Sequence, residues 1–276
     1  MKKILSVVAL GACLTLGAHA EATKADTSSA TVQNKQQSGN VINLAGKQRM
    51  LTQKMSKEAL FAAKGIDADA NKANLAKTAA LFDKTLNGLI NGDESLGLPK
   101  TENPEIVGQL KKVKELWGPF KASIEKGDLE AISKQNIPLL KNMNAAVQMY
   151  AKASGSKLDP EMAQTINVAG RQRMLTQKMT KELLLAANGI DADANLANAK
   201  KTFKLFETTL ADLTAKAKDA KISDQLGVVK GIMVEYQPII EGGDISEGSL
   251  KKAEAVNMKL LKESNNAVTM YKASIK

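Results

Sequence analysis

The amino-acid sequence predicts an all-α protein made of two tandem four-helix-bundle units related by an internal duplication. Three observations support this fold class. Aromatic residues make up only 3% of the 276 residues, while residues that favour helices, such as Ala, Leu, Lys and Met, are plentiful. No segment alternates apolar and polar residues over the length of a strand. Finally, a segment in the first half of the chain returns in the second half.

The repeat is clearest over 14 residues. Residues 42–55 read INLAGKQRMLTQKM, and residues 166–179 read INVAGRQRMLTQKM, an offset of 124 residues. Residues 65–71 recur at 189–195 with the same offset, and the match loosens further along each copy. We therefore expect two units of the same architecture.

The first 20 residues resemble a secretory signal peptide. Lys2 and Lys3 form a basic start, residues 4–17 are apolar, and small residues precede a cleavage site after Ala20. The apolar run is too short for a comfortable membrane span. The sequence thus predicts an exported, periplasmic protein. A lipoprotein acylated at Cys13 is the less favoured alternative.

Cleavage after Ala20 removes Cys13 and His19, the one cysteine and the one histidine of the chain. The mature protein then lacks the residues for disulfides, for Cys or His metal sites, for a thiol nucleophile and for a Ser-His-Asp triad. We accordingly expect no enzyme, no cofactor and no metal site.

The remaining chain divides into a leader and two units. Residues 21–38 are polar and rich in Thr, Ser and Gln, so we expect a disordered leader. The first unit covers residues 39–153 and the second residues 159–276, with a linker at residues 154–157. Asp159 and Pro160 suit the start of the helix that opens the second unit.

Each unit reads as four helices. The first helices cover about residues 40–64 and 162–188, and the third helices about residues 106–126 and 226–240. Pro119 and Pro238 are expected to bend or end the third helices. The fourth helices run from Asp128 to Tyr150 and from Asp244 to Tyr271, with each aspartate as a cap.

The turn after each first helix repeats as well. Gly65 and Gly189 suit the left-handed residue after a helix end, and Asp67 and Asp191 can cap the second helices. The aspartates also imitate the start of a calcium-binding EF-hand loop. The glutamate required at its twelfth position is replaced by Thr78 in the first copy, so we favour capping.

Arginine is confined to the repeated motif. Of 39 basic residues only Arg49, Arg171 and Arg173 are arginines, and all the others are lysines. A guanidinium presents a planar fork of donors that a lysine lacks, so its exclusive use here indicates a specific role. A solvated arginine, or one paired with an acid on a neighbouring helix, is the alternative interpretation.

The helical period places the arginines on a shared stripe. At about 100° per residue, Arg49 lies on the same face as the Gly one turn earlier and the Gln one turn later. A buried guanidinium on such a face needs an anionic or strongly polar partner. Two such helices, paired by symmetry, could hold a planar oxyanion between them. The predicted ligand-binding residues are Gly46, Arg49, Gln53, Gly170, Arg173 and Gln177.

Asn144 and Asn265 interrupt the apolar stripe of the fourth helices. We expect buried polar residues that fix the packing register, and a ligand contact is the alternative.

Loss of Lys2 and Lys3 lowers the net charge from +10 to +8, and the lysines are mixed with acids along every helix. We expect no nucleic-acid binding, and at most weak adhesion to anionic membranes.

The repeated motif resembles the opening helix of the PilJ-type sensor domain of type IV pilus methyl-accepting chemotaxis receptors. It is more distantly similar to the P-box of nitrate- and nitrite-sensing histidine kinases. The resemblance implies four-helix bundles that dimerise through the first helix. It also implies that Arg49 and Arg173 correspond to the P-box arginine that grips nitrate at the dimer axis, and that Gly46 and Gly170 correspond to the glycine beside it.

The chain departs from the family in two ways. Lys47, Lys54 and Lys178 stand where the family often has Arg. The family's usual membrane span and signalling domain have no counterpart in the sequence.

Two functions remain open. The first is a periplasmic sensory protein that binds a nitrate- or nitrite-like anion and signals through a membrane chemoreceptor or sensor kinase, with a homodimer as an option. The second is a ligand-free adaptor that docks a chemoreceptor, a sensor kinase or a pilus component.

Overall fold

A computed structural model describes the backbone of residues 16–276 and the side chains from residue 30 onward. Cys13 and most of the predicted signal peptide lie outside the described residues. The described residues form eight α-helices, two short 3-10 helices and no β-strand. The first unit contains α1 (Leu16–Ala63), α2 (Ala68–Asn91), η1 (Glu94–Leu96), α3 (Pro104–Lys126), α4 (Leu129–Ala153) and η2 (Ser154–Ser156). The second contains α5 (Pro160–Ala187), α6 (Ala192–Lys216), α7 (Ala220–Gly242) and α8 (Glu247–Ala273).

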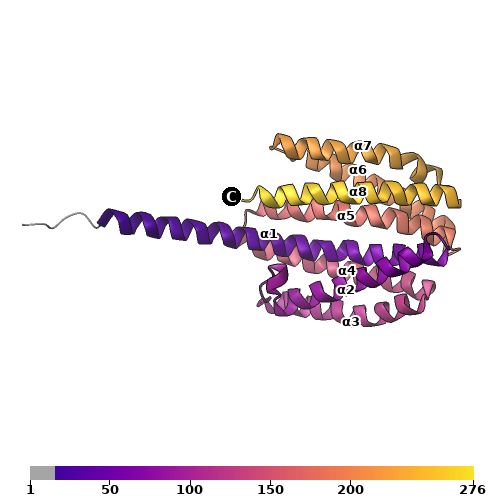
Figure 1. Ribbon diagram of the computed structural model, residues 1–276, viewed down its shortest axis with the longest axis horizontal. Helices are drawn as coiled ribbons and strands as arrows, with labels where there is room; N and C mark the ends of the chain where they lie inside the picture. The colour runs from indigo at the N-terminus through magenta and orange to yellow at the C-terminus, as the bar shows by residue number, and fades with distance from the viewer. Residues whose placement is uncertain (1–15) are drawn as a thin grey trace, which may run out of the picture.

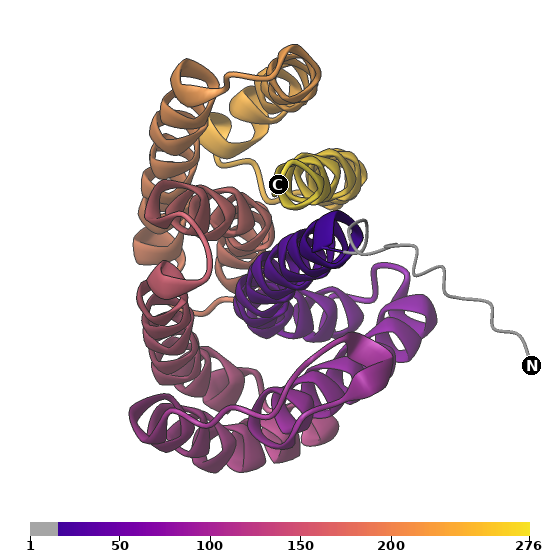
Figure 2. The same ribbon diagram turned by 90° about the vertical axis from the view of Figure 1, so that its left-hand side faces the viewer.

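The all-α fold with two tandem bundles is confirmed. Within each unit the first helix packs on the second and the fourth, and the third packs on the fourth. The two units join through their first helices, α1 and α5, which share the most extensive helix contact of the molecule (Figures 1 and 2). The buried apolar residues of both units form one continuous core. A motif helix therefore has two buried sides, one facing its own bundle and one facing the other unit.

The fourth helices also reach across the join. Helix α4 contacts α5, and α8 contacts α1. The molecule is consequently a pseudo-symmetric pair, in which four helices from both units surround the centre. No helix in the described part of the chain combines the length and the apolar character needed to cross a membrane.

The disordered leader expected at residues 21–38 is wrong, because these residues belong to α1. No glycine or proline interrupts this stretch, so helix propensity carries α1 through it. Its end also packs on the C-terminus, where Lys35 Nζ donates to Lys276 O at 3.1 Å. A methyl group on Gly39 would lie 2.4 Å from Ile275 Cδ1, so an alanine there would require the end of the Ile275 side chain to shift.

The turns after α1 and α5 are partly as expected. Gly65 and Gly189 are left-handed, with φ of 74° and 77°. Asp67 and Asp191 are wrong as side-chain caps, because both are themselves left-handed and accept no capping hydrogen bond. The Asn71 amide instead closes the first turn by donating to two backbone carbonyls.

The sequence predicts four other residues at helix ends, and the structure confirms one of them. Pro119 and Pro238 lie inside α3 and α7, so neither ends its helix. Asp128 caps α4 as predicted, by accepting from the backbone three residues on. Asp244 does not cap α8. It accepts from the N–H of Ser246 at 2.9 Å, and Ser246 is the cap.

Candidate functional site

Arg49 and Arg173 meet at the centre of the molecule, where α1 packs against α5. Arg49 is 0% exposed and Arg173 is 1% exposed. Each guanidinium reaches the other helix: Arg49 Nη2 donates to Asn167 O at 3.0 Å, and Arg173 Nη2 donates to Asn43 O at 3.2 Å. The helices α1 and α5 are thus tied together by a reciprocal pair of arginines.

The fourth helices supply the second acceptor for each arginine. Arg49 Nη1 donates to Asn144 Oδ1 at 2.8 Å, and Arg173 Nη1 donates to Asn265 Oδ1 at 3.0 Å. Asn144 is half-buried and Asn265 is exposed. The two asparagines therefore hold the arginines at the rim of the site, and the buried Nε atom of each arginine has no partner.

The motif glycines make room at this centre. A methyl group on Gly46 would lie 3.3 Å from Arg49 Nη2 and 3.8 Å from Arg173 Nη2. A methyl group on Gly170 would lie 3.3 Å from Arg173 Nη2 and 3.6 Å from Arg49 Nη2. Both guanidiniums thus border the space that each missing side chain leaves, as the shared stripe predicts.

The site carries two positive charges and no compensating acid. Within the residues that the structure describes, neither arginine forms an ion pair with a carboxylate. Burial, together with the nearby positive charges of Arg171 and Arg173, lowers the pKa of Arg49 to about 9. Burial lowers the pKa of Arg173 to about 10. Buried like charges repel by a few kcal/mol at a separation of a few Å. A bound anion would offset the free-energy cost of burying the two guanidiniums and would reduce the repulsion between them.

Gln53 and Gln177, also expected in the ligand site, do not join the arginines. Gln53 Nε2 donates to Asn136 Oδ1 at 2.9 Å, and Gln177 Nε2 donates to Asn257 Oδ1 at 2.7 Å. The glutamines are on the predicted face, but the fourth helix packs over them one turn beyond each arginine. They form a separate buried polar layer.

Asn136 and Asn257 are buried polar residues that the sequence reasoning missed. The Asn136 amide also donates to Thr52 O at 2.9 Å and to Ser56 Oγ at 3.0 Å. The Asn257 amide donates to the equivalent atoms of α5. The signal was available, since both are asparagines eight residues before Asn144 and Asn265 in the same helices.

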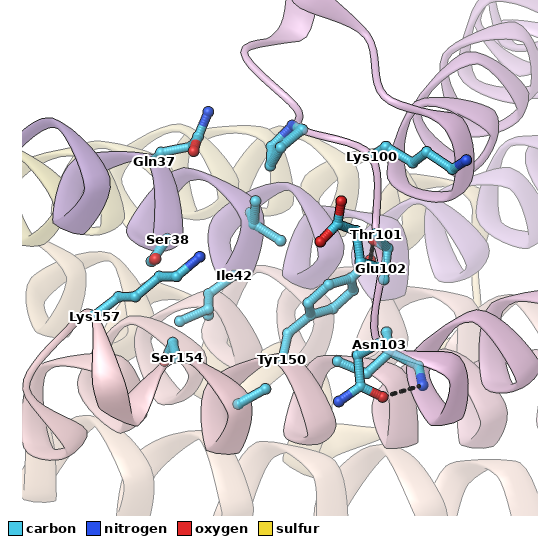
Figure 3. Close-up of a pocket in the computed structure, with 14 residues that line it drawn as sticks. Gln37, Ser38, Ile42, Lys100, Thr101, Glu102, Asn103, Tyr150, Ser154 and Lys157 are labelled. Carbon is cyan, nitrogen blue, oxygen red and sulfur yellow. Dashed lines mark hydrogen bonds between the residues drawn. The ribbon is translucent and has the colours of Figure 1, made fainter.

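A separate cavity of about 540 Å³ lies in the first unit, between the middle of α1, the α2–α3 loop and the end of α4 (Figure 3). The Tyr150 hydroxyl and Thr101 Oγ1 lie 2.6 Å apart there, and burial raises the pKa of Tyr150 to about 12. The cavity lies apart from the arginine pair, since neither Arg49 nor Arg173 lines it. In the described residues no three Asp, Glu, His or Cys side chains gather as a metal site.

Comparisons with known proteins agree with this architecture. The model of the PilJ family, described as the N-terminal part of the type IV pili methyl-accepting chemotaxis transducer, matches residues 30–146 and 160–242. The chain is also 33% identical over 132 residues to the methyl-accepting chemotaxis protein McpN of Pseudomonas aeruginosa. That match covers 45% of the chain and 24% of the relative, so the chain spans about a quarter of that receptor's length. No solved structure matches the chain.

The two matched segments correspond to the two helical units, and each contains one arginine of the central pair, Arg49 or Arg173. The resemblance carried by the repeated motif is therefore confirmed. The chain belongs to the PilJ family of chemotaxis-transducer N-terminal domains.

Proposed function

We propose that the protein is a periplasmic sensory protein that binds one small planar oxyanion, such as nitrate or nitrite, between Arg49 and Arg173. The observation that carries this proposal is a pair of fully buried guanidiniums with no carboxylate partner in the described chain. An uncompensated buried charge is costly, and here there are two side by side. An anion of charge −1 would leave the centre with a net charge near +1.

The geometry favours a planar anion. Each guanidinium is a planar fork that matches two oxygens of a planar oxyanion. Gly46 and Gly170 leave space beside both Nη2 atoms. A methyl group at either glycine would lie 3.3 Å from a guanidinium nitrogen, so room beside the two forks is limited and a small planar anion is favoured over a bulky tetrahedral one such as sulfate.

Burial of the site couples occupancy to helix position. Because the arginines are 0% and 1% exposed, an anion reaches them only if neighbouring helices move. The bonds nearest to the site join Arg49 to Asn167 O on α5 and Arg173 to Asn43 O on α1. An anion that takes over these donors shifts α1 against α5, and a membrane chemoreceptor or sensor kinase would read that shift.

One chain supplies both halves of the proposed site. The arginines of α1 and α5 occupy equivalent positions around the pseudo-symmetry axis. Anion binding therefore needs no second copy of the chain, and a homodimer is not part of the proposed mechanism.

The ligand-free adaptor is the second candidate. The observation in its favour is that each guanidinium already has two acceptors within the protein, an asparagine side chain and a backbone carbonyl. In that case the arginines are a structural polar layer, and the outer helices dock a receptor or pilus component.

Thermal unfolding in matched sodium salts separates the two candidates. We expect a saturable rise in Tm with nitrate or nitrite and none with chloride, acetate, sulfate or phosphate. The double variant Arg49→Met plus Arg173→Met should fold, because it replaces buried charges by apolar side chains of similar length, and should lose the response. Arg171→Lys keeps a positive charge near the site and is the matched control, which should retain the rise in Tm with nitrate. A Tm of the folded wild-type protein that is the same in all of these salts would contradict anion binding and favour the adaptor.

A further inference from the structure

Each unit buries one lysine where its first helix meets the fourth helix of the other unit. These are Lys57 on α1 and Lys181 on α5, related by the repeat offset of 124 residues. Lys57 is 3% exposed and Lys181 is 6% exposed. A buried ammonium requires a counter-charge, so the surroundings of the two lysines can be compared directly.

Lys57 has its counter-charge within the chain. Its Nζ lies 2.7 and 2.6 Å from the two carboxylate oxygens of Glu254 on α8, and 3.3 Å from Asn257 Oδ1. The carboxylate therefore neutralises the ammonium at close range.

Lys181 lacks that carboxylate. Its Nζ donates to Asn136 Oδ1 at 3.1 Å and forms no ion pair with any residue that the structure describes. Asn136 corresponds to Asn257 with an offset of 121 residues, and the same offset places Ser133 where the other copy has Glu254. Burial lowers the pKa of Lys181 to about 8. The molecule thus contains two copies of one site, and one copy has lost its acid.

The neighbouring carboxylate does not substitute for the missing acid. Glu182 is paired with Lys178 on the same helix and accepts from Thr202 Oγ1 at 2.7 Å. Its negative charge raises the pKa of Lys181, but the effect of burial is larger.

Lys181 opens onto a groove of about 450 Å³ between α4, α5 and α6, a volume within the range of small-molecule sites. The groove is also lined by Lys141, Arg171 and Lys178, and by no acidic side chain. Ile137 and Leu205 form part of its apolar wall and are 66% and 44% exposed. The equivalent groove beside Lys57 includes the carboxylate of Glu254.

We propose that the groove at Lys181 binds an aliphatic monocarboxylate. The ligand's carboxylate occupies the place above Ser133 that the Glu254 carboxylate occupies in the other copy, and it pairs with the Lys181 ammonium. The ligand's hydrocarbon chain lies along Ile137 and Leu205. This site adjoins the arginine pair through Asn144, which lines the groove and accepts from Arg49, but its charge partner is Lys181, so the proposal stands whether or not an anion binds between the arginines.

Calorimetric titration of the purified protein with sodium butyrate, hexanoate and octanoate tests the proposal. We expect saturable binding of one acid per chain, with affinity rising about fourfold for each added methylene group until the groove is filled. Hexanol and hexylamine have the same chain without the negative charge, and we expect neither to bind. Failure of all three acids to bind would overturn the proposal, even if an acidic peptide bound.

Two exchanges between the copies make the test specific. Ser133→Glu restores the missing carboxylate within the chain and should abolish hexanoate binding in a folded protein, as should Lys181→Met. Glu254→Ser removes the carboxylate beside Lys57 and should create a second hexanoate site. The double variant Arg49→Met plus Arg173→Met should bind hexanoate like the wild type, which separates this site from the anion site. Unchanged hexanoate binding by Ser133→Glu would place the ligand elsewhere and refute the assignment.

Discussion

The two buried lysines predict that one substitution has different effects in the two copies. Lys181→Met removes an ammonium that is buried without a carboxylate, and Lys57→Met removes one that pairs with Glu254. Methionine has a similar length and flexibility and fills the space with an apolar chain. We expect the first variant to be more stable than the wild type at pH 7, and the second to gain nothing.

The size of the first effect follows from the pKa of Lys181. A fall from 10.5 in the unfolded chain to about 8 in the folded protein corresponds to a penalty of about 3 kcal/mol at pH 7. Loss of the hydrogen bond to Asn136 offsets about 1 kcal/mol of the gain. We therefore expect Lys181→Met to raise the free energy of unfolding by about 2 kcal/mol.

For Lys57→Met the balance differs. The variant also relieves the burial of an ammonium, whose pKa burial lowers. It loses charge-assisted hydrogen bonds to Glu254 worth about 2 to 3 kcal/mol, and leaves a carboxylate whose side chain is only 23% exposed without its partner. Relief and loss cancel, or the loss prevails.

The pH dependence of stability tests whether the buried Lys181 ammonium lowers the free energy of unfolding. Because the folded pKa of Lys181 is depressed, its penalty is fully present below about pH 8 and is relieved as the pH rises toward 10.5. From this group the wild type gains about 2 kcal/mol between pH 7 and 9.5, and Lys181→Met does not. The difference in free energy of unfolding between wild type and variant isolates Lys181, because the neighbouring charged groups titrate in both proteins. These groups are Lys178, Glu182, Lys141 and Arg171.

Urea unfolding of the wild type and both variants at pH 7 and pH 9.5 measures these quantities. Equal stabilisation by both substitutions would refute the reasoning, because it would mean that Glu254 does nothing for Lys57. A Lys181→Met advantage that persists unchanged at pH 9.5 would also refute it.

Two further predictions concern the motif and the turns. Gly46→Ala and Gly170→Ala place methyl groups 3.3 Å from guanidinium nitrogens, a distance that small side-chain shifts accommodate. We therefore expect the fold to persist and the affinity for nitrate to fall at least tenfold. Equal affinity in a nitrate titration would show that the anion lies elsewhere. Asp67→Gly should raise the free energy of unfolding by about 1 kcal/mol, because φ is 45° and no capping bond is lost; Asp191→Gly at φ 40° is its internal repeat, and a decrease in urea unfolding for either would contradict this.

Much of the fold could be predicted from the sequence because the duplication reports it twice. The glycine at the end of each first helix marks where that helix stops, and the helical period of about 3.6 residues identifies the face of the motif that is buried. The leader at residues 21–38 could not be predicted from its polar composition, because its helix is continuous with α1 and its end is held by contacts with the C-terminus. Such a contact joins residues at opposite ends of the chain.

The arginine pair could be anticipated, while its surroundings could not. Exclusive use of Arg in one motif, with Gly one turn earlier, pointed to residues that meet across α1 and α5. The stripe defines a face of the helix and says nothing of which helix covers it. For that reason the stripe predicts Gln53 and Gln177 in the same site as the arginines, whereas in the structure they donate to Asn136 and Asn257. The role of the arginines as ligand-binding residues stays a prediction.

The difference between the lysine sites required the structure for another reason. The copies align with an offset of 124 residues in their first helices and 121 in their fourth. The hydrogen bonds of Asn136 and Asn257 to equivalent residues of the first helices show that these two asparagines, and therefore Ser133 and Glu254, are equivalent positions in the two copies. Without them, Ser133 and Glu254 are two unrelated residues on lysine-rich helices.

The central claim is that two half-sites in one chain form a single anion site. Isothermal titration of nitrate into the wild-type protein and into Arg49→Met measures it most directly. We expect one nitrate per chain for the wild type and a loss of binding in the single variant, since each arginine contributes one of two required forks. Two nitrates per chain, or unchanged binding by Arg49→Met, would contradict it.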